Sequence, residues 1–211
     1  MCARDHTTMI QRFHVHPEHP PLRQIARAVE VLNKGGLIVY PTEATYALGC
    51  KMDAQDALTR LRLIRQLDKE HRMTLICRDL SELASYAQVD NPSFRLLKKY
   101  TPGPYTFILP GSAQLPRRLS DPKRKTIGLR IPDHNVVHAL LSELGAPLLS
   151  STLQLPGDEL PLSDPDEIED RLAKQVDILL DAGACGLEPT TVVDLTGDAP
   201  RVLRQGLGAF E

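Results

Sequence analysis

Short apolar runs alternate with amphipathic stretches along most of this chain, and this alternation constrains the fold more than any other feature. Residues 22–34 repeat apolar side chains at helical spacing, whereas Leu37–Tyr40 is a short apolar run typical of a buried strand. The alternation predicts the α/β class, and several turn-linked strands predict a mixed sheet. We expect helices at residues 22–34, 53–66, 81–86, 135–144 and 164–173 and one from 91, and strands at 37–40, 73–77, 105–109, 127–131, 147–151, 178–181, 191–195 and 201–204.

The length of 211 residues suits one domain, and the absence of tryptophan predicts an aliphatic core. Residues 1–21 are polar, so we expect an N-terminal extension before a domain that spans residues 22–208. His14 and His16 in this extension allow two interpretations, a metal-binding pair or an edge segment. We favour the edge segment, because no cysteine or carboxylate completes a ligand set beside them, and we predict no metal site.

Charge and composition exclude several classes of function. The formal net charge of −2 excludes a globally basic nucleic-acid binder, although it leaves room for a local basic patch. No apolar run approaches the roughly 20 residues of a membrane span, and the N-terminus lacks the apolar core of a signal peptide. The four cysteines form no C-x-x-C pair, which is typical of reduced thiols. We therefore expect a cytoplasmic protein without a membrane partner.

One predicted strand, residues 127–131, carries an arginine, Arg130, within an apolar run. A buried guanidinium must meet an anion, because removing its charge from water without a partner is costly. The anion is either a protein carboxylate, which makes an internal salt bridge, or a bound ligand. Carboxylate and phosphate both suit the bidentate geometry of arginine.

Polar clusters stand at the ends of the predicted strands, where ligands of α/β proteins bind. They combine hydroxyls, glycines and arginines, without a nucleophile-and-base pair or a phosphate-loop motif. Such groups suit an anionic ligand such as a nucleotide or an amino acid. A turn or cap role is the alternative for each threonine taken alone. The clusters are residues 40–49, 101–106, 150–154, 190–191 and 204–206.

Several short motifs follow one another in a fixed order along the chain. They are Tyr40-Pro-Thr-Glu, Pro102-Gly-Pro-x-Thr106, Thr126-Ile-Gly-Leu-Arg-Ile-Pro132, Thr190-Thr-Val-Val-Asp194 and Leu203-Arg204-x-Gly206. Their order resembles the YrdC/YciO family over residues 22–208, and some segments look most like its YciO branch. The resemblance implies a YrdC-like α/β domain with a large twisted mixed sheet, flanking helices and a concave positive face. It also implies synthesis of threonylcarbamoyl-AMP from threonine, bicarbonate and ATP with Mg²⁺, for transfer RNA modification, and an association with double-stranded RNA.

The same resemblance assigns site residues by position. Catalysis would then be positioning and charge stabilisation, which falls to Arg65 and Arg130. The threonine-contacting residues would be Thr42, Arg130 and Thr190. The nucleotide-contacting residues would be Arg65, Thr126, Ser150, Thr152, Gln154 and Arg204.

Two departures from the synthase pattern bear on activity. The Lys-x-Arg motif of the synthases is Arg65-Gln-Leu67 here, and their Ser-x-Asn is Thr152-Leu-Gln154. Losing one cation near developing charge costs about a hundredfold in rate or more, unless Lys69 or Arg72 replaces it. We therefore expect synthase activity to be weak, altered or absent. Two alternatives are a noncatalytic RNA-binding or ribosome-associated protein, and an enzyme that hydrolyses the adenylate.

A basic stretch precedes the Arg130 strand and carries one acid, Asp121. Such a stretch binds phosphates without reading sequence, so it is a candidate site for double-stranded RNA or transfer RNA. A solvated surface loop is the alternative. The basic residues are Arg117, Arg118, Lys123, Arg124 and Lys125.

Overall fold

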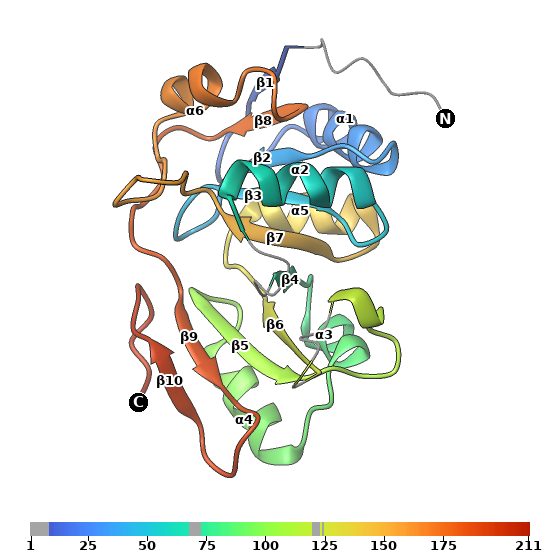
Figure 1. Cartoon of the computed structure of the whole chain (residues 1–211), viewed down its shortest axis with the longest axis vertical. Coiled ribbons are helices and arrows are strands. Elements are labelled where there is room, and N and C mark those ends of the chain that lie inside the picture. The colour runs from blue at the N-terminus through green and yellow to red at the C-terminus, as the bar shows by residue number, and fades with distance from the viewer. Residues whose placement is uncertain (1–8, 68–72, 120–122, 124) are drawn as a thin grey trace.

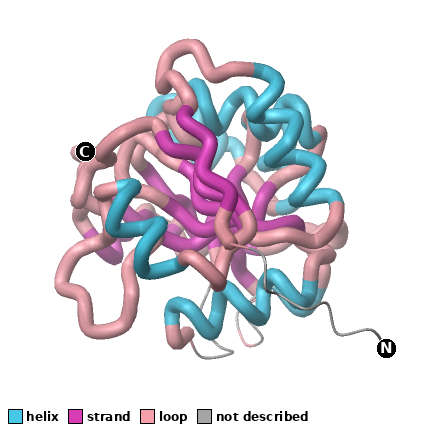
Figure 2. The backbone as a smooth tube through the Cα atoms, turned by 90° about the horizontal axis from the view of Figure 1, so that it is seen from above, coloured by secondary structure: helices cyan, strands magenta, loops and turns pink. Residues whose placement is uncertain are grey.

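A computed structural model describes residues 9–67, 73–119, 123 and 125–211 of the chain. Its strands form one sheet in the order β1-β8-β2-β3-β7-β4-β6-β5-β9-β10, with helices on both sides (Figures 1 and 2). The strands are β1 (Gln11–His14), β2 (Ile38–Tyr40), β3 (Ala47–Lys51), β4 (Thr74–Ile76), β5 (Tyr105–Pro110), β6 (Thr126–Arg130), β7 (Leu148–Thr152), β8 (Ile178–Asp181), β9 (Thr191–Asp194) and β10 (Arg201–Arg204). The α-helices are α1 (Leu22–Asn33), α2 (Gln55–Arg65), α3 (Leu80–Tyr86), α4 (Asn91–Tyr100), α5 (Asn135–Leu144) and α6 (Pro165–Leu172), and Arg117–Leu119 is a 3₁₀ turn.

The sheet is mixed, as predicted. Strand β4 runs parallel to β6 and antiparallel to β7, and β5 runs parallel to β9 and antiparallel to β6. The eight predicted strands are present within one or two residues at each end. Strand β3 is not among the predicted strands, and its Ala47 and Gly49 have low strand propensity. It forms because it pairs with both β2 and β7.

Strand β1 comes from the segment predicted as an N-terminal extension, and it pairs in parallel with β8 at one edge of the sheet. Arg12 anchors it through an ion pair of 2.8 Å with buried Asp181. His14 Nδ1 also lies 2.7 Å from Asp181 Oδ2, a carboxylate far away in the sequence. No group of three metal-ligating side chains is found among the residues described.

One face of the sheet is covered from β8 to β9, whereas the residues of the edge strand β10 are exposed. Alternate strand residues such as Leu48, Leu75 and Phe107 point to this face and belong to one apolar core cluster. Helix α2 contributes Leu61 and helix α4 contributes Leu97 to the same cluster. The strand period of two makes this face continuous, because every second side chain of each strand points into it.

The opposite face is covered only in part. Helices α1 and α5 pack together on it, and their buried residues form a second cluster with Ile38, Leu148 and Leu180 from strands β2, β7 and β8. Leu22, the first residue of α1, lies outside this cluster and is 76% exposed.

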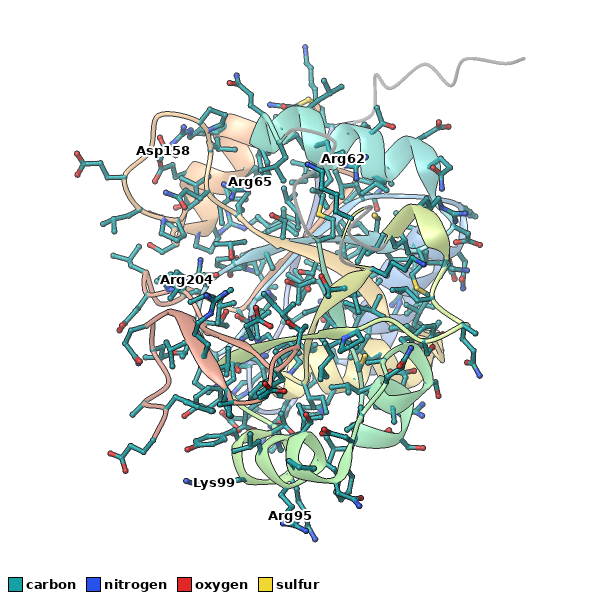
Figure 3. The ribbon with its side chains drawn as sticks, turned by 60° about the horizontal axis from the view of Figure 1, so that its bottom comes forward. Arg62, Arg65, Arg95, Lys99, Asp158 and Arg204 are labelled. Carbon is teal, nitrogen blue, oxygen red and sulfur yellow. The ribbon has the colours of Figure 1, made fainter. Side chains whose placement is uncertain are left out.

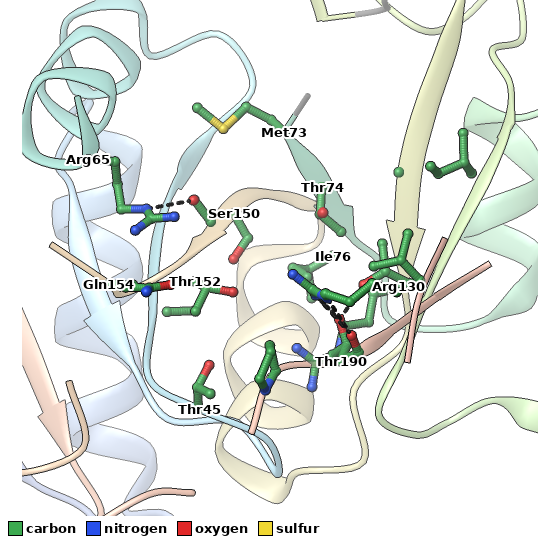
Figure 4. Close-up of a pocket in the computed structure, with 18 residues that line it drawn as sticks. Thr45, Arg65, Met73, Thr74, Ile76, Arg130, Ser150, Thr152, Gln154 and Thr190 are labelled. Carbon is green, nitrogen blue, oxygen red and sulfur yellow. Dashed lines mark hydrogen bonds between the residues drawn. The ribbon is translucent and has the colours of Figure 1, made fainter. Parts of the chain in front are cut away.

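The other half of this face, formed by β4, β6, β5 and β9, carries neither helix and opens onto a cavity (Figure 4). Helices α3 and α4 lie with this lower half of the sheet in Figure 1, and α4 and Leu83 of α3 pack into the first core cluster on the other face. None of the helices in the described ranges is long and apolar enough to cross a membrane. Polar residues of these strands line the cavity.

Candidate functional site

The cavity has a volume of about 240 Å³ and is lined mainly by threonines, serines and arginines from strands far apart in the sequence. Figure 4 shows these side chains around one open space, with Arg65 and Arg130 on different sides of it. The polar lining residues are Thr45, Arg65, Thr74, Thr106, Arg130, Ser150, Ser151, Thr152, Gln154, Thr190 and Arg204.

Strand alternation explains which residues reach the cavity. On β6, Gly128 and Arg130 line it while the residue between them belongs to the covered core. On β5, Thr106 and Ile108 line it by the same rule. Gly128 keeps the floor open, because a Cβ atom there would lie 3.3 Å from Thr74 Oγ1.

Arg130 is only 7% exposed, and its Nη2 atom lies 2.7 Å from Glu43 Oε2. The internal ion pair that the sequence allowed is therefore present, and Arg130 also lines the cavity. The pair lacks hydrogen-bond geometry: Nε and Nη2 of Arg130 and both Glu43 oxygens have no hydrogen-bonding partner in the described structure. Buried donors without a partner are costly, so this guanidinium retains capacity for a ligand.

Arg65 and Arg204 differ from Arg130, because the described residues place no carboxylate beside either. Arg65 ends α2 and donates from Nε to Ser151 Oγ at 3.4 Å. Arg204 donates to the Thr190 carbonyl at 2.8 Å from Nη2. Burial lowers the pKa of Arg65, and partial burial lowers the pKa of Arg204, which stays more exposed. Figure 3 shows both arginines on the left side of the molecule.

Two hydroxyl pairs connect the cavity wall to its surroundings. The Tyr40 hydroxyl lies 2.6 Å from Ser150 Oγ, and the Thr106 and Thr190 hydroxyls lie 2.8 Å apart. Ser150, Thr106 and Thr190 all line the cavity, whereas Tyr40 lies behind the wall and is fully buried. These bonds hold the wall hydroxyls in place before any ligand arrives.

Most of the predicted site residues meet in this cavity. Arg65, Arg130, Ser150, Thr152, Gln154, Thr190 and Arg204 line it, although they come from five separate segments of the sequence. Their roles toward threonine or a nucleotide stay predictions.

Two predicted residues, Thr42 and Thr126, lie outside the cavity lining. The Thr42 hydroxyl donates to the Thr45 carbonyl at 2.7 Å and accepts from two backbone amides, which is the turn role that a lone threonine often has. Thr126 lies on the same face of β6 as Gly128, and its buried hydroxyl has no hydrogen-bonding partner in the described structure.

The structure also shows where the two motifs that differ from the synthase pattern lie. Leu67 is partly buried and packs against the first core cluster, and Lys69 and Arg72 lie outside the described residues. The Gln154 side chain lines the cavity but donates both to the Asp158 carbonyl at 3.0 Å and to that of the next residue. Its amide nitrogen therefore braces the loop that follows β7.

The basic stretch lies apart from the cavity lining. Arg118 donates to the Met52 carbonyl at 3.1 Å, which leaves it less available to RNA than an unbound side chain. Lys123 and Lys125 have exposed side chains. Arg124 lies outside the described residues, as does the side chain of Arg117. RNA binding by this stretch stays a prediction.

The sequence reasoning did not select several cavity residues. Thr74 was not selected at all, and Thr106 was named only as a member of the polar cluster 101–106, although both line the cavity. Strand alternation indicates only which residues of one strand share a face. That Thr74 lies opposite Gly128, and Ile76 opposite Arg130, depends on the register of β4 and β6, which neither strand determines alone.

A family model of Sua5, YciO and YrdC proteins, described as telomere recombination, matches residues 30–206 of this chain. The chain belongs to this family. It is 55% identical over 200 residues to the uncharacterized protein YciO of Escherichia coli strain K12, covering 95% of this chain and 97% of that protein. The crystal structure of E. coli YciO superposes with a TM-score of 0.92 over 95% of this chain and 98% of that one.

Family members with a named activity are more distant. A threonylcarbamoyl-AMP synthase of Vibrio vulnificus is 31% identical over 159 residues, which cover 74% of this chain and 84% of the synthase. The structure of P. abyssi Sua5 complexed with L-threonine is 25% identical, with a TM-score of 0.84 over 93% of this chain and 57% of that one. The family resemblance seen in the sequence is thereby confirmed.

Proposed function

We propose that this protein is a threonylcarbamoyl-AMP synthase-like protein that binds ATP or an AMP-like ligand together with threonine in the cavity. We further propose that its synthase reaction is much slower than that of family members with an intact Lys-x-Arg motif. The likeness to a threonylcarbamoyl-AMP synthase and to a Sua5 structure with bound L-threonine supports the choice of ligands.

The observation that carries the proposal is a pair of cations in one cavity, for which the described part of the chain supplies no counter-charge. Arg65 and Arg204 both line it, and the described residues place no carboxylate beside either side chain. Partly buried positive charge is unfavourable until an anion arrives, so the cavity favours an anionic ligand. Guanidinium groups beside hydroxyl donors suit phosphate oxygens.

The synthase reaction requires little covalent chemistry from the protein. The carboxylate of N-carboxythreonine attacks the α-phosphate of ATP, a new phosphorus–oxygen bond forms, and pyrophosphate leaves with its electron pair. Arginines placed around the phosphates stabilise the developing charge. Since the described lining of the cavity carries no carboxylate, Mg²⁺ would be held by the ATP phosphates.

The slow rate follows from Leu67. Where the synthases have a second cation, this chain has an apolar side chain that packs against the core. One missing cation near developing charge is worth about a hundredfold in rate. Nucleotide binding depends less on this position, because Arg65 and Arg204 remain.

A cytoplasmic location accords with a protein that uses ATP and keeps its cysteines reduced.

The test is pyrophosphate release and product detection with the purified protein, ATP, threonine, bicarbonate and Mg²⁺. Wild type is run beside the double variant Arg65→Lys with Leu67→Arg, and nucleotide binding is measured for both. We expect slow turnover in the wild type and a gain of tenfold or more in the variant. Fast wild-type turnover would refute the proposed slowing. Failure of both proteins to turn over and to bind ATP or AMP would refute the whole proposal and favour the RNA-binding alternative.

A further inference from the structure

A fully buried tyrosine, Tyr40, reaches the cavity wall from the covered half of the sheet. It ends β2, and its hydroxyl lies 2.6 Å from Ser150 Oγ on β7. Strand β3 lies between these two strands, so the ring has to cross it. It crosses at Gly49, where a Cβ atom would lie 2.6 Å from Tyr40 Cε1. The absence of a side chain at Gly49 therefore makes this long-range hydrogen bond possible.

The direction of this hydrogen bond follows from counting donors and acceptors. Tyr40 is 0% exposed, and Ser150 is the one hydrogen-bonding partner that the described residues give its hydroxyl. If Ser150 donated, the proton of Tyr40 would be buried without an acceptor, which is unfavourable. Burial also raises the pKa of Tyr40 to about 12, so the proton stays on this oxygen at neutral pH. Tyr40 must therefore donate, and Ser150 must accept.

The proton of Ser150 is then available for another acceptor. Ser150 lines the cavity, and the described residues give its hydroxyl no second partner. A serine hydroxyl that already accepts one hydrogen bond donates its own proton to whatever acceptor stands opposite. The cavity that it faces also contains Arg65 and Arg204, whose charges favour an anion.

We propose that Tyr40 is a positioning residue that commits Ser150 to donate a hydrogen bond to an anionic ligand in the cavity. This inference rests on the proposed function, because it needs a phosphate-bearing ligand. Without the tyrosine hydroxyl, the Ser150 hydroxyl would donate its hydrogen bond to the ligand only part of the time, because it could also rotate in other directions. Tyr40 thereby acts on the ligand through Ser150, and it does not touch the ligand itself.

The test is a double-mutant cycle on ligand affinity, with AMP as the charged probe and adenosine as the neutral one. Tyr40→Phe and Ser150→Ala should each weaken AMP binding by roughly tenfold, because a hydrogen bond to a charged group is lost or misdirected. The double variant should bind AMP no more weakly than Ser150→Ala alone. Adenosine affinity should change less than twofold in all three variants, measured by calorimetry.

A matched control is Tyr46→Phe, which removes another buried tyrosine hydroxyl that donates to the Gly183 carbonyl at 2.7 Å. It should lower the midpoint of thermal unfolding but leave AMP affinity unchanged. Three outcomes would each overturn the positioning role while leaving the proposed function intact. The affinity losses of the single variants could multiply in the double variant, AMP and adenosine could lose affinity equally, or Tyr40→Phe could keep its AMP affinity. A wild-type protein that binds neither AMP nor ATP would overturn both.

Discussion

The two halves of one sheet face have the same strand alternation, but the side chains that point out of the sheet differ in polarity between them. In the half covered by α1 and α5, the side chains that point out of the sheet are apolar, such as Ile38 and Leu148. In the half formed by β4, β6, β5 and β9, residues in equivalent positions include Thr106 and Arg130, and they line a cavity. The side chains therefore match what covers them: apolar residues lie beneath the two helices, and polar residues line the half that no helix covers.

The largest effect on stability should come from the covered half. Leu140 on α5 is 0% exposed and packs in the second core cluster, so Leu140→Ala should cost about 3 kcal/mol of unfolding free energy. Ile108 lines the cavity, and Ile108→Ala should cost about 2 kcal/mol, because the space it leaves joins one that is already open. Urea denaturation measures the unfolding free energy of both variants. A larger loss of unfolding free energy for Ile108→Ala than for Leu140→Ala would contradict this prediction.

The next effect tests the buried ion pair at the cavity. Glu43→Gln removes the charge 2.7 Å from Arg130 and should cost about 2 kcal/mol of unfolding free energy, because the arginine stays buried without compensation. The same variant should bind AMP a few times more tightly, since the cavity becomes more positive.

A control for this prediction removes both charges together. Glu43→Leu combined with Arg130→Met should be closer to wild type in stability than Glu43→Gln, as replaced buried pairs often are. Its AMP affinity should fall below that of the wild type. Equal stability of Glu43→Gln and wild type would show that the pair is not needed to compensate Arg130.

A smaller effect separates binding from stability in the cavity half. Arg65→Ala should weaken AMP binding by roughly tenfold, because a charged hydrogen-bonding group is lost. The free energy of unfolding should stay within about 0.5 kcal/mol or rise, since the removed cation is partly buried and the described residues place no carboxylate beside it. Arg62→Ala on the same helix, outside the cavity lining, is the matched control and should keep AMP affinity. Calorimetry with AMP would contradict the prediction if both variants lost affinity equally.

The smallest effect concerns pH at the boundary between the halves. Burial lowers the pKa of His134, whose Nδ1 accepts from the Val136 amide at the start of α5. The unfolded chain binds this proton more readily, so stability is present above the unfolded pKa of about 6.5 and is lost as pH falls toward the lower folded pKa. Between pH 7.5 and 5, wild type should lose more stability than His134→Asn, which keeps a capping acceptor without titrating. Parallel pH profiles of the two proteins would rule this out.

The sequence predicted the α/β class and eight of the described strands for reasons that are local, whereas the family resemblance supplied most of the predicted residues that line the cavity. Apolar runs give strands, and Arg130 stands out because a charge in an apolar run needs an anion. Strand β3 was missed because its propensity is low and its formation depends on partners from β2 and β7. Thr42 looked like a ligand contact by position in its motif, while its hydroxyl closes the turn that contains it.

Most helices and strands, the family, and the arginines and hydroxyls available for chemistry can be inferred from the sequence alone. Which of these side chains meet depends on the folded molecule. Period-two alternation says that Gly128 and Arg130 share a face, but not that Thr74, Thr106 and Thr190 join them. That requires pairing between strands far apart in the chain, and it requires that no helix cover this half of the face. Both depend on packing of the whole molecule, which no single segment encodes.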